Sequence, residues 1–149
     1  MESIGNISLF DRKKIGFLAG SKIAPLSVLP TLDWASTVAT HEDVAFVSGF
    51  HSQLERQVLD LLLKGKCGII CVLARSLYSK VPVEYKSAFD CGRVLFITEE
   101  KQSRATKDSA SRRNQLLATL ADELYLPQIS KESSIHKLLI NYNKPLFHL

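Results

Sequence analysis

The sequence predicts an α/β protein built on one doubly wound, mostly parallel sheet of six strands, with helices on both faces. Three observations support this fold class. Short apolar segments alternate with amphipathic ones along the whole chain. Residues 68–73 form a continuous apolar run, which is typical of a strand that helices cover on both faces. No internal repeat or low-complexity tract interrupts the alternation.

The predicted elements follow one another in regular order. Residues 53–64 have the clearest helical pattern, because their leucines and valine recur at steps of three and four. Pro25 and Pro82 stand near the starts of two other helices, where proline is tolerated. We expect strands at 15–19, 44–47, 68–73, 93–97, 123–126 and 145–148, and helices at 25–38, 53–64, 82–91, 109–121 and 133–142. Residues 1–13 are interpreted as an N-terminal extension and 14–149 as one domain.

Composition narrows the class of protein. The 149 residues are 46% hydrophobic and 23% charged, as in ordinary globular domains. No apolar run is long enough to cross a bilayer and the N-terminus lacks the pattern of a signal peptide, so we expect a cytoplasmic protein without a membrane partner. Three cysteines without metal-ligand spacing indicate reduced, packed thiols, and neither a metal nor a cofactor is predicted.

The junction between the strand at 44–47 and the helix at 53–64 has the character of an anion site. Such a turn directs backbone N–H groups and the positive end of the helix dipole toward one point. Gly49 would allow a ligand to approach the backbone, although a tight turn without a ligand is the alternative interpretation. The turn matches neither the dinucleotide-binding fingerprint nor the phosphate loop of ATPases, so classical NAD binding and ATP hydrolysis are not supported.

Side chains of the same turn are further candidates. Ser48 and Ser52 could donate hydroxyl hydrogen bonds to an anion, and His51 could contact a phosphate or a base. The spacing of Ser52 and Glu55 also fits a capping box, which would explain both residues without a ligand. Phe50 could stack on a base.

A second junction carries the positive charge. Residues 101–113 contain five basic side chains and one acid, so this window alone equals the net charge of +4 of the whole chain. We interpret Arg112, Arg113 and Asn114 as a phosphate-binding group at a helix start, because the arginine side chain matches phosphate oxygens and because cations there oppose the helix dipole unless an anion offsets them. A solvated helix end is the alternative. Arg104 extends the group.

The predicted topology brings several turns together. The carboxyl ends of parallel strands meet at one edge of the sheet, where ligands bind near the point at which strand order reverses. The turn Gly20, Ser21 and Lys22 falls there with the Gly49 turn and the basic segment. Arg75 follows a third strand and could close the same crevice, unless it pairs with Glu84.

Four segments resemble the Rossmann-like core of the DNA-processing protein A family (DprA/Smf), within a wider group that includes LOG-type nucleotide hydrolases. The segments are VSGFHSQLERQVLDLL, VLARSLY, GRVLFIT and SRRNQLLATLADELYL, and the resemblance covers about residues 14–149. In this family the glycine turn and the R-N segment form a positively charged pocket for single-stranded DNA. The resemblance therefore implies DNA contacts at Ser48, Gly49 and Ser52, at Arg112, Arg113 and Asn114, and at Gly20, Ser21 and Lys22, which stand where the family has G-S-R.

The sequence departs from the family in two places. The family's glycine turn reads SGxAxGID, whereas Phe50, His51 and Ser52 fill it here. The LOG-type signature PGGxGTxxE would fall near 126–134, which lacks its glycine pair and its glutamate step and retains Ser133 and Ser134 as polar groups. This difference argues against N-glycosidic hydrolysis.

The sequence therefore predicts a non-enzymatic, stand-alone domain that binds single-stranded DNA through its phosphate backbone and supports DNA processing or recombination. A nucleotide-binding protein, or a LOG-like nucleoside monophosphate hydrolase, using the same crevice is the alternative. A scaffold that has lost its ligand is a third hypothesis. A homodimer is compatible with the predicted sheet edges and apolar helix faces, and the sequence identifies no protein partner.

Overall fold

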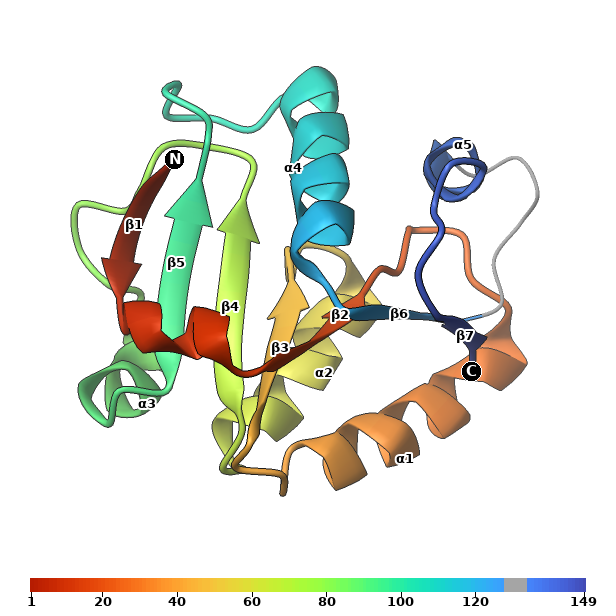
Figure 1. The fold of residues 1–149 in the computed structure, drawn as a ribbon, viewed down its shortest axis with the longest axis horizontal. Helices are drawn as coiled ribbons and strands as arrows, with labels where there is room; N and C mark the ends of the chain where they lie inside the picture. The colour runs from red at the N-terminus through yellow and green to blue at the C-terminus, as the bar shows by residue number, and fades with distance from the viewer. Residues whose placement is uncertain (128–133) are drawn as a thin grey trace.

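The computed structural model describes residues 1–127 and 134–149 and has seven strands in one sheet (Figure 1). The strands are β1 (Glu2–Gly5), β2 (Lys13–Phe17), β3 (Val44–Ser48), β4 (Gly68–Leu73), β5 (Val94–Thr98), β6 (Glu123–Leu126) and β7 (Leu146–His148). Their order across the sheet is β1-β5-β4-β3-β2-β6-β7. All neighbours are parallel except β1, which runs antiparallel to β5. The predicted α/β class with a mostly parallel sheet is thus confirmed.

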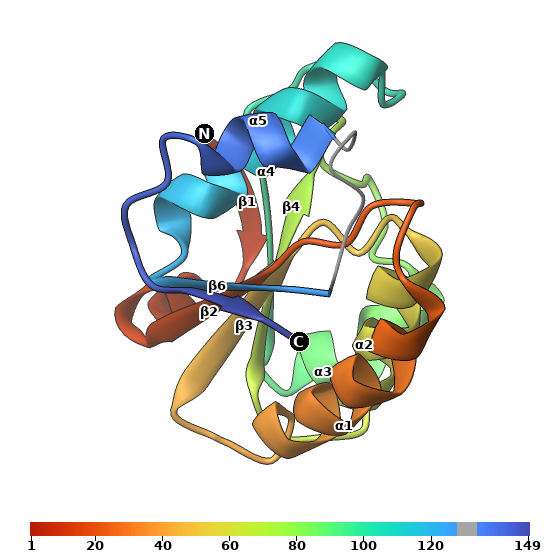
Figure 2. The ribbon, with the colours of Figure 1, turned by 90° about the vertical axis from the view of Figure 1, so that its right-hand side faces the viewer.

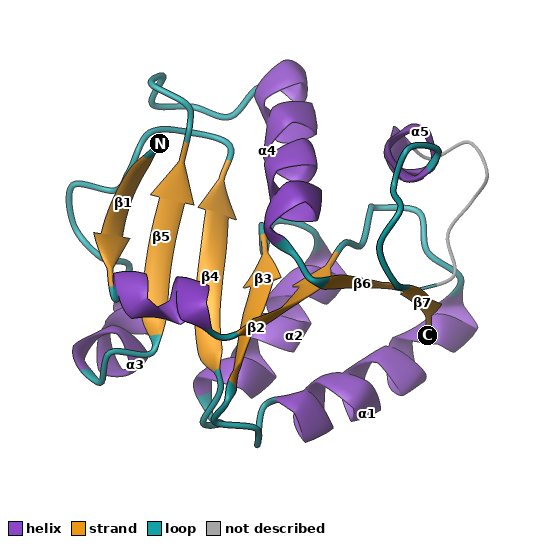
Figure 3. Cartoon of the chain, viewed as in Figure 1, coloured by secondary structure: helices purple, strands orange, loops and turns teal. Residues whose placement is uncertain are grey.

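The helices lie on both faces of this sheet (Figure 2). They are α1 (Val28–Val38), α2 (Gln53–Leu63), α3 (Lys86–Asp90), α4 (Lys107–Leu120) and α5 (Ser134–Leu139), with short 3-10 helices η1 (Ile7–Asp11), η2 (Pro25–Ser27) and η3 (Val83–Tyr85). The core under α1, α2 and α3 contains Phe17, Phe46 and Phe96. The core on the other face, under η1, α4 and α5, contains Leu117 and Leu124. Figure 3 distinguishes the helices from the strands of the sheet by colour.

The strand count is one higher than predicted, because Glu2–Gly5 forms β1 at the edge of the sheet. Only Ile4 in this segment is apolar and partly buried, so no apolar run marks the strand in the sequence. Its stability comes from pairing with β5, where Ile4 lies opposite Phe96. Residues 2–5, interpreted as part of an extension, are therefore integrated into the sheet.

Several predicted boundaries shift. The strand expected at 15–19 is Lys13–Phe17, and the helix expected from 109 begins at Lys107. Pro30 does not interrupt α1, because it lies in the first turn, where the backbone N–H groups have no partner within the helix. The predicted helix start at Ser133 lies outside the described residues, and α5 ends at Leu139 rather than at 142.

A cluster of aromatic rings links α1 to the strands β2, β3, β6 and β7. The Trp34 ring on α1 lies 5.6 Å from Phe17 and 5.4 Å from Phe46, between ring centroids. Its other side stacks on Tyr125 of β6 at 4.5 Å, and Tyr125 in turn stacks on Phe147 of β7 at 4.7 Å. These contacts fasten the last strand, which is otherwise exposed, to the core.

Two of the three thiols are packed as the sequence predicts. Burial raises the pKa of Cys67 to about 11 and that of Cys71 to about 12. Cys91, at the end of α3, is exposed instead.

Candidate functional site

An open pocket of about 910 Å³ lies where the order of strands reverses. From β2 the chain proceeds to β3, β4 and β5 on one side, and then returns through α4 to β6 on the other side (Figure 1). The pocket walls come from the turn after β2, from the start of α2 and from the first two turns of α4. This is the edge at which the doubly wound topology predicts a ligand.

The pocket brings together about half of the residues that the sequence singled out. Its lining includes Gly20, Ser21, Lys22, His51, Ser52, Arg113 and Asn114. Ser48, Gly49, Phe50, Arg75, Arg104 and Arg112 are not part of the lining. The turn at residues 20–22, part of the turn after β3 and the second turn of α4 therefore line the same pocket.

The Glu55 carboxylate accepts hydrogen bonds from backbone N–H groups of the Gly49 turn. Oε1 accepts hydrogen bonds from the N–H groups of His51 at 2.9 Å and Ser52 at 3.0 Å, and Oε2 accepts one from Ala19 at 3.0 Å. The side chain is only 3% exposed, and Ser52 completes a capping box with it. The capping interpretation is thus confirmed, and the expectation that these turn N–H groups are free for a phosphate is wrong.

Gly49 lies against the side chain of Arg113. Its φ is not positive, and a Cβ on this residue would lie 2.8 Å from Nε and 2.9 Å from Cδ of Arg113. The absence of a side chain at Gly49 therefore makes room for the Arg113 guanidinium to lie against the turn.

The positive φ of the turn falls on Phe50, at 49°. The left-handed conformation is unfavourable for a bulky residue and persists where packing imposes it. Here the Phe50 ring is 6% exposed and stacks on Phe46 at 6.1 Å. Ser48 is fully buried and accepts a hydrogen bond from the Phe50 N–H at 3.3 Å. Phe50 therefore belongs to the core, and the expectation that it stacks on a base is wrong.

Arg113 and Asn114 present polar groups to the pocket. Nε and Nη2 of Arg113 donate to Oδ1 of Asn114 at 3.2 and 3.1 Å. Within residues 1–127 and 134–149 no carboxylate lies within salt-bridge distance of Arg113. Its charge is thus oriented by a neutral amide but not neutralised.

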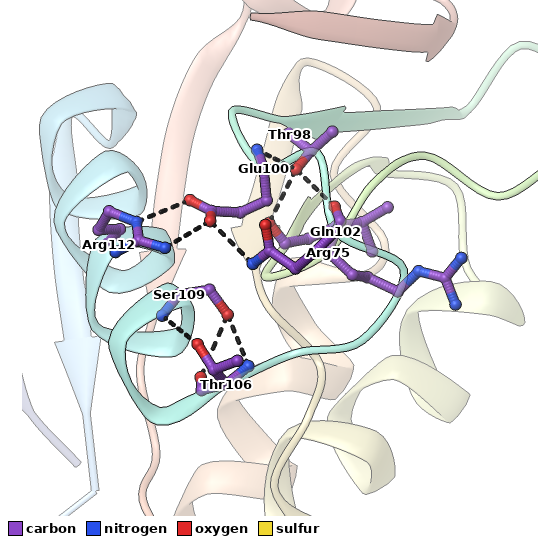
Figure 4. A network of polar contacts seen from close by, with 8 residues as sticks. Arg75, Thr98, Glu100, Gln102, Thr106, Ser109 and Arg112 are labelled. Carbon is purple, nitrogen blue, oxygen red and sulfur yellow. Dashed lines mark hydrogen bonds and ion pairs between the residues drawn. The ribbon is translucent and has the colours of Figure 1, made fainter.

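Arg112 faces a different side of α4, because successive helical residues are about 100° apart. Its guanidinium forms a bidentate ion pair with Glu100, with Nε to Oε2 at 2.9 Å and Nη2 to Oε1 at 2.6 Å (Figure 4). These hydrogen bonds, with one from Gln102 at 3.0 Å, hold the pKa of Glu100 at about 2. Arg112, which the sequence predicted to bind phosphate, is therefore already paired with the Glu100 carboxylate.

The position of α4 also corrects the dipole argument. Thr106 is the N-cap, and Lys107 and Asp108 occupy the first turn. Arg112 and Arg113 lie in the second turn, where the effect of the helix dipole on a charge is weaker. These two arginines therefore do not oppose the helix dipole strongly enough to require an anion at the first turn.

Arg75 and Arg104 lie away from the pocket. The Arg75 guanidinium is 4.7 Å from the centre of the Tyr78 ring, and its Nε donates to the Ser76 carbonyl at 3.0 Å. In Figure 4 the side chain points away from Arg112. Its partner is thus Tyr78 and not Glu84. Arg104 is exposed on the loop between β5 and α4.

Two acids shape this region, Glu55 as the occupant of the turn and Glu100 as the partner of Arg112. The Ser52-x-x-Glu55 spacing predicted the capping box of Glu55, but not its hydrogen bond with the Ala19 N–H group. Sequence reasoning missed Glu100, whose only signal is an acid directly after a strand. The LOG-type signature cannot be compared here, because 128–133, including Ser133, lie outside the described residues.

Comparison with known proteins points to one group. No protein-family model matches the chain, and no curated sequence matches it significantly. Among solved structures, the chain is similar to DNA processing protein A from Helicobacter pylori, with 25% identity, a TM-score of 0.76, and coverage of 98% of this chain and 69% of that one. DNA processing protein A from Streptococcus pneumoniae gives 15% identity and a TM-score of 0.76, over 98% of this chain and 53% of that one.

A third, more distant structure shares the fold. The Moco carrier protein from Chlamydomonas rheinhardtii has 13% identity and a TM-score of 0.58, over 93% of this chain and 76% of that one. The present chain thus spans about two thirds of the first DprA structure and about half of the second. The sequence resemblance is confirmed at the level of structure: this chain has a Rossmann-like fold whose structural neighbours are DprA proteins.

Proposed function

We propose that this chain binds single-stranded DNA through its sugar-phosphate backbone and supports DNA processing or recombination in the cytoplasm. The H. pylori neighbour binds single-stranded DNA. For the present chain, the supporting observation is the meeting of Lys22, Lys107 and Arg113 in one pocket at the switch point of the sheet.

The electrostatics of the pocket favour an anion. Among the described residues that line it, Glu55 is the one acid, and its oxygens accept three backbone hydrogen bonds. Three cationic side chains therefore face the space against one internally engaged carboxylate. A phosphate would take hydrogen bonds from the Arg113 guanidinium, with Lys22 and Lys107 as point charges on either side.

The backbone of the first turn adds donors. Gly20 and Ser21 line the pocket, and no described residue accepts a hydrogen bond from either N–H group. These groups, and not those of the Gly49 turn, are available to phosphate oxygens. The mechanism needs no base contact, so we expect little sequence preference and no catalytic group.

Fluorescence anisotropy with a labelled oligonucleotide of about 16 nucleotides, the upper end of common site sizes, tests this proposal. Each neutralised phosphate contributes roughly −0.7 to the slope of log K against log salt, so three cations give roughly −2. Arg113→Ala should weaken binding about tenfold, equivalent to about 1.4 kcal/mol. Lys66→Ala is the matched control, because exposed Lys66 precedes β4 at the opposite edge of the sheet. Binding that ignores salt, or equal effects of the two substitutions, would contradict the proposal.

A free nucleotide is the second candidate ligand, and one observation favours it. Ile23 and Val28 line the pocket together with the cationic residues, so an apolar surface for a base accompanies the phosphate-binding groups. Thermal shift measurements with a panel of mononucleotides would separate the two ligands. Stabilisation by one mononucleotide at concentrations where the oligonucleotide does not bind would favour the nucleotide.

A further inference from the structure

We infer that Glu100 acts as an internal competitor for DNA: it occupies Arg112 and so limits the polyanion-binding surface to the pocket side of α4. The inference rests on the proposed function, because it concerns how strongly the same region attracts a phosphate chain. It assigns to Glu100 a role in setting affinity.

The pairing is too well supported for Arg112 to exchange partners freely. Glu100 is 7% exposed at its side chain and receives two guanidinium hydrogen bonds and the Gln102 amide. Its own backbone N–H donates to Thr98 Oγ1 at 3.0 Å, which fixes the residue at the end of β5 (Figure 4). A phosphate that took Arg112 would leave a buried carboxylate with Gln102 as its remaining side-chain donor, which is unfavourable.

Arg112 is nevertheless well placed to contact DNA. Its side chain is 54% exposed, and it directly precedes the pocket-lining Arg113 in the same turn of the helix. Exposed Lys101 and Arg104 are on the adjoining loop. A strand that leaves the pocket over α4 toward this loop would pass Arg112, whose charge the ion pair with Glu100 offsets.

A purely structural role for Glu100 makes the opposite prediction. Thr98 Oγ1 donates to the Arg75 carbonyl at 2.6 Å, and the Ser76 N–H donates to the Gln102 carbonyl at 2.8 Å. The Glu100 network thus also joins the β4 and β5 loops. If Glu100 acts only by ordering these loops, its removal disorders the basic segment and weakens DNA binding. If it competes for Arg112, its removal strengthens binding.

The experiment is a double-mutant cycle on the full chain, measured by anisotropy over a range of salt. Glu100→Gln should tighten binding roughly two- to fivefold, because the Arg112 side chain is exposed and solvent screens its charge, and should increase the salt slope by about 0.7. Arg112→Gln should weaken binding, because it leaves the Glu100 charge uncompensated. The double variant Glu100→Gln with Arg112→Gln should return close to the wild-type affinity.

Glu99→Gln is the control for long-range charge, because Glu99 is the exposed neighbour on the same loop and its removal changes the net charge equally. Equal gains from Glu99→Gln and Glu100→Gln, a weaker Glu100→Gln variant, or a gain that persists in the double variant would overturn the inference. Melting temperatures of all variants verify that each is folded.

Failure of the proposed function gives a separate result. If the wild type binds no oligonucleotide at low salt, the same variants are compared by the salt concentration at which they elute from immobilised heparin, a generic polyanion. The inference then requires later elution of Glu100→Gln than of both the wild type and Glu99→Gln. Elution in any other order overturns it.

Discussion

The two strand-to-helix junctions at the pocket, β3 to α2 and β5 to α4, are built alike but are electrostatically opposite. Both helices begin with a capping box, Ser52 with Glu55 and Thr106 with Ser109. At α2 the residue at the third helical position is Glu55, and its carboxylate accepts hydrogen bonds from three surrounding N–H groups. At α4 the box is neutral, and Lys107 follows its N-cap directly. On the proposed function, an anion would therefore contact side chains of the second junction and not the backbone of the first.

The largest effect that tests this difference is expected at Glu55. Glu55→Ala removes three backbone hydrogen bonds to a buried carboxylate and should lower the free energy of unfolding by about 2–4 kcal/mol. Urea denaturation measures this change. Glu99→Ala, at an exposed position, should stay within about 0.5 kcal/mol. A loss below about 1 kcal/mol at Glu55 would mean that the junction does not depend on its internal anion.

Gly49→Ala should separate binding from stability. The new Cβ would displace the Arg113 guanidinium, a flexible group, so we expect DNA affinity to fall by up to about tenfold, the effect expected of losing Arg113 itself. Stability should change by less than about 1 kcal/mol, because the φ of Gly49 is accessible to alanine. Anisotropy and urea denaturation measure the two effects.

Gly65→Ala provides the contrast, because its Cβ would lie 2.4 Å from the Ala39 carbonyl oxygen. Backbone cannot yield as a side chain does, so this variant should lose stability while its folded fraction keeps the wild-type affinity. Unchanged DNA affinity in Gly49→Ala would show that Arg113 does not depend on the turn.

The neutral cap of α4 is expected to have a smaller effect. Thr106→Ala should lower the free energy of unfolding by about 1 kcal/mol, as is usual for the loss of an N-cap side chain. Thr106→Ser keeps the hydroxyl and serves as the conservative control. If Thr106→Ala and Thr106→Ser lower the melting temperature equally, the hydroxyl of Thr106 does not stabilise the helix as a cap.

The pH dependence of stability provides the last test, and it acts only in acid. The folded-state pKa of Glu100 is lowered from 4.5 to about 2 by the Arg112 and Gln102 hydrogen bonds. Its contribution is therefore present above pH 4.5 and is lost as the pH falls toward 2. The melting-temperature difference between wild type and Glu100→Gln should be constant above about pH 5 and shrink below it. A constant difference down to pH 2 would rule out the ion pair as its cause.

The fold could be predicted largely from local patterns, because buried parallel strands leave continuous apolar runs. The strands Gly68–Leu73 and Glu123–Leu126 match the predicted bounds. The strand β1 left no such run, because an edge strand buries little. The hydrophobic pattern therefore does not reveal a strand that is stabilised by pairing with a neighbouring strand and buries few side chains.

The site could be predicted only in outline. Topology places the Gly20 turn and α4 at the same edge, which the sequence indicated correctly. The neutral box at Thr106 and Ser109 lacks the usual glutamate or glutamine. The predicted start of α4 is therefore two residues late, and both arginines are predicted about half a turn too close to the helix start. The partners of Arg112 and Arg113 are tertiary contacts, and local spacing contains no information on them.

Trp34 lies between Phe46 and Tyr125, so its fluorescence reports on the packing of these rings. The chain has a single tryptophan, so all indole emission comes from this stack. Tyr125 passes the contact on to Phe147 in the final strand. A change that moves Tyr125 away from the indole ring should thus be visible as a shift in fluorescence, without any label.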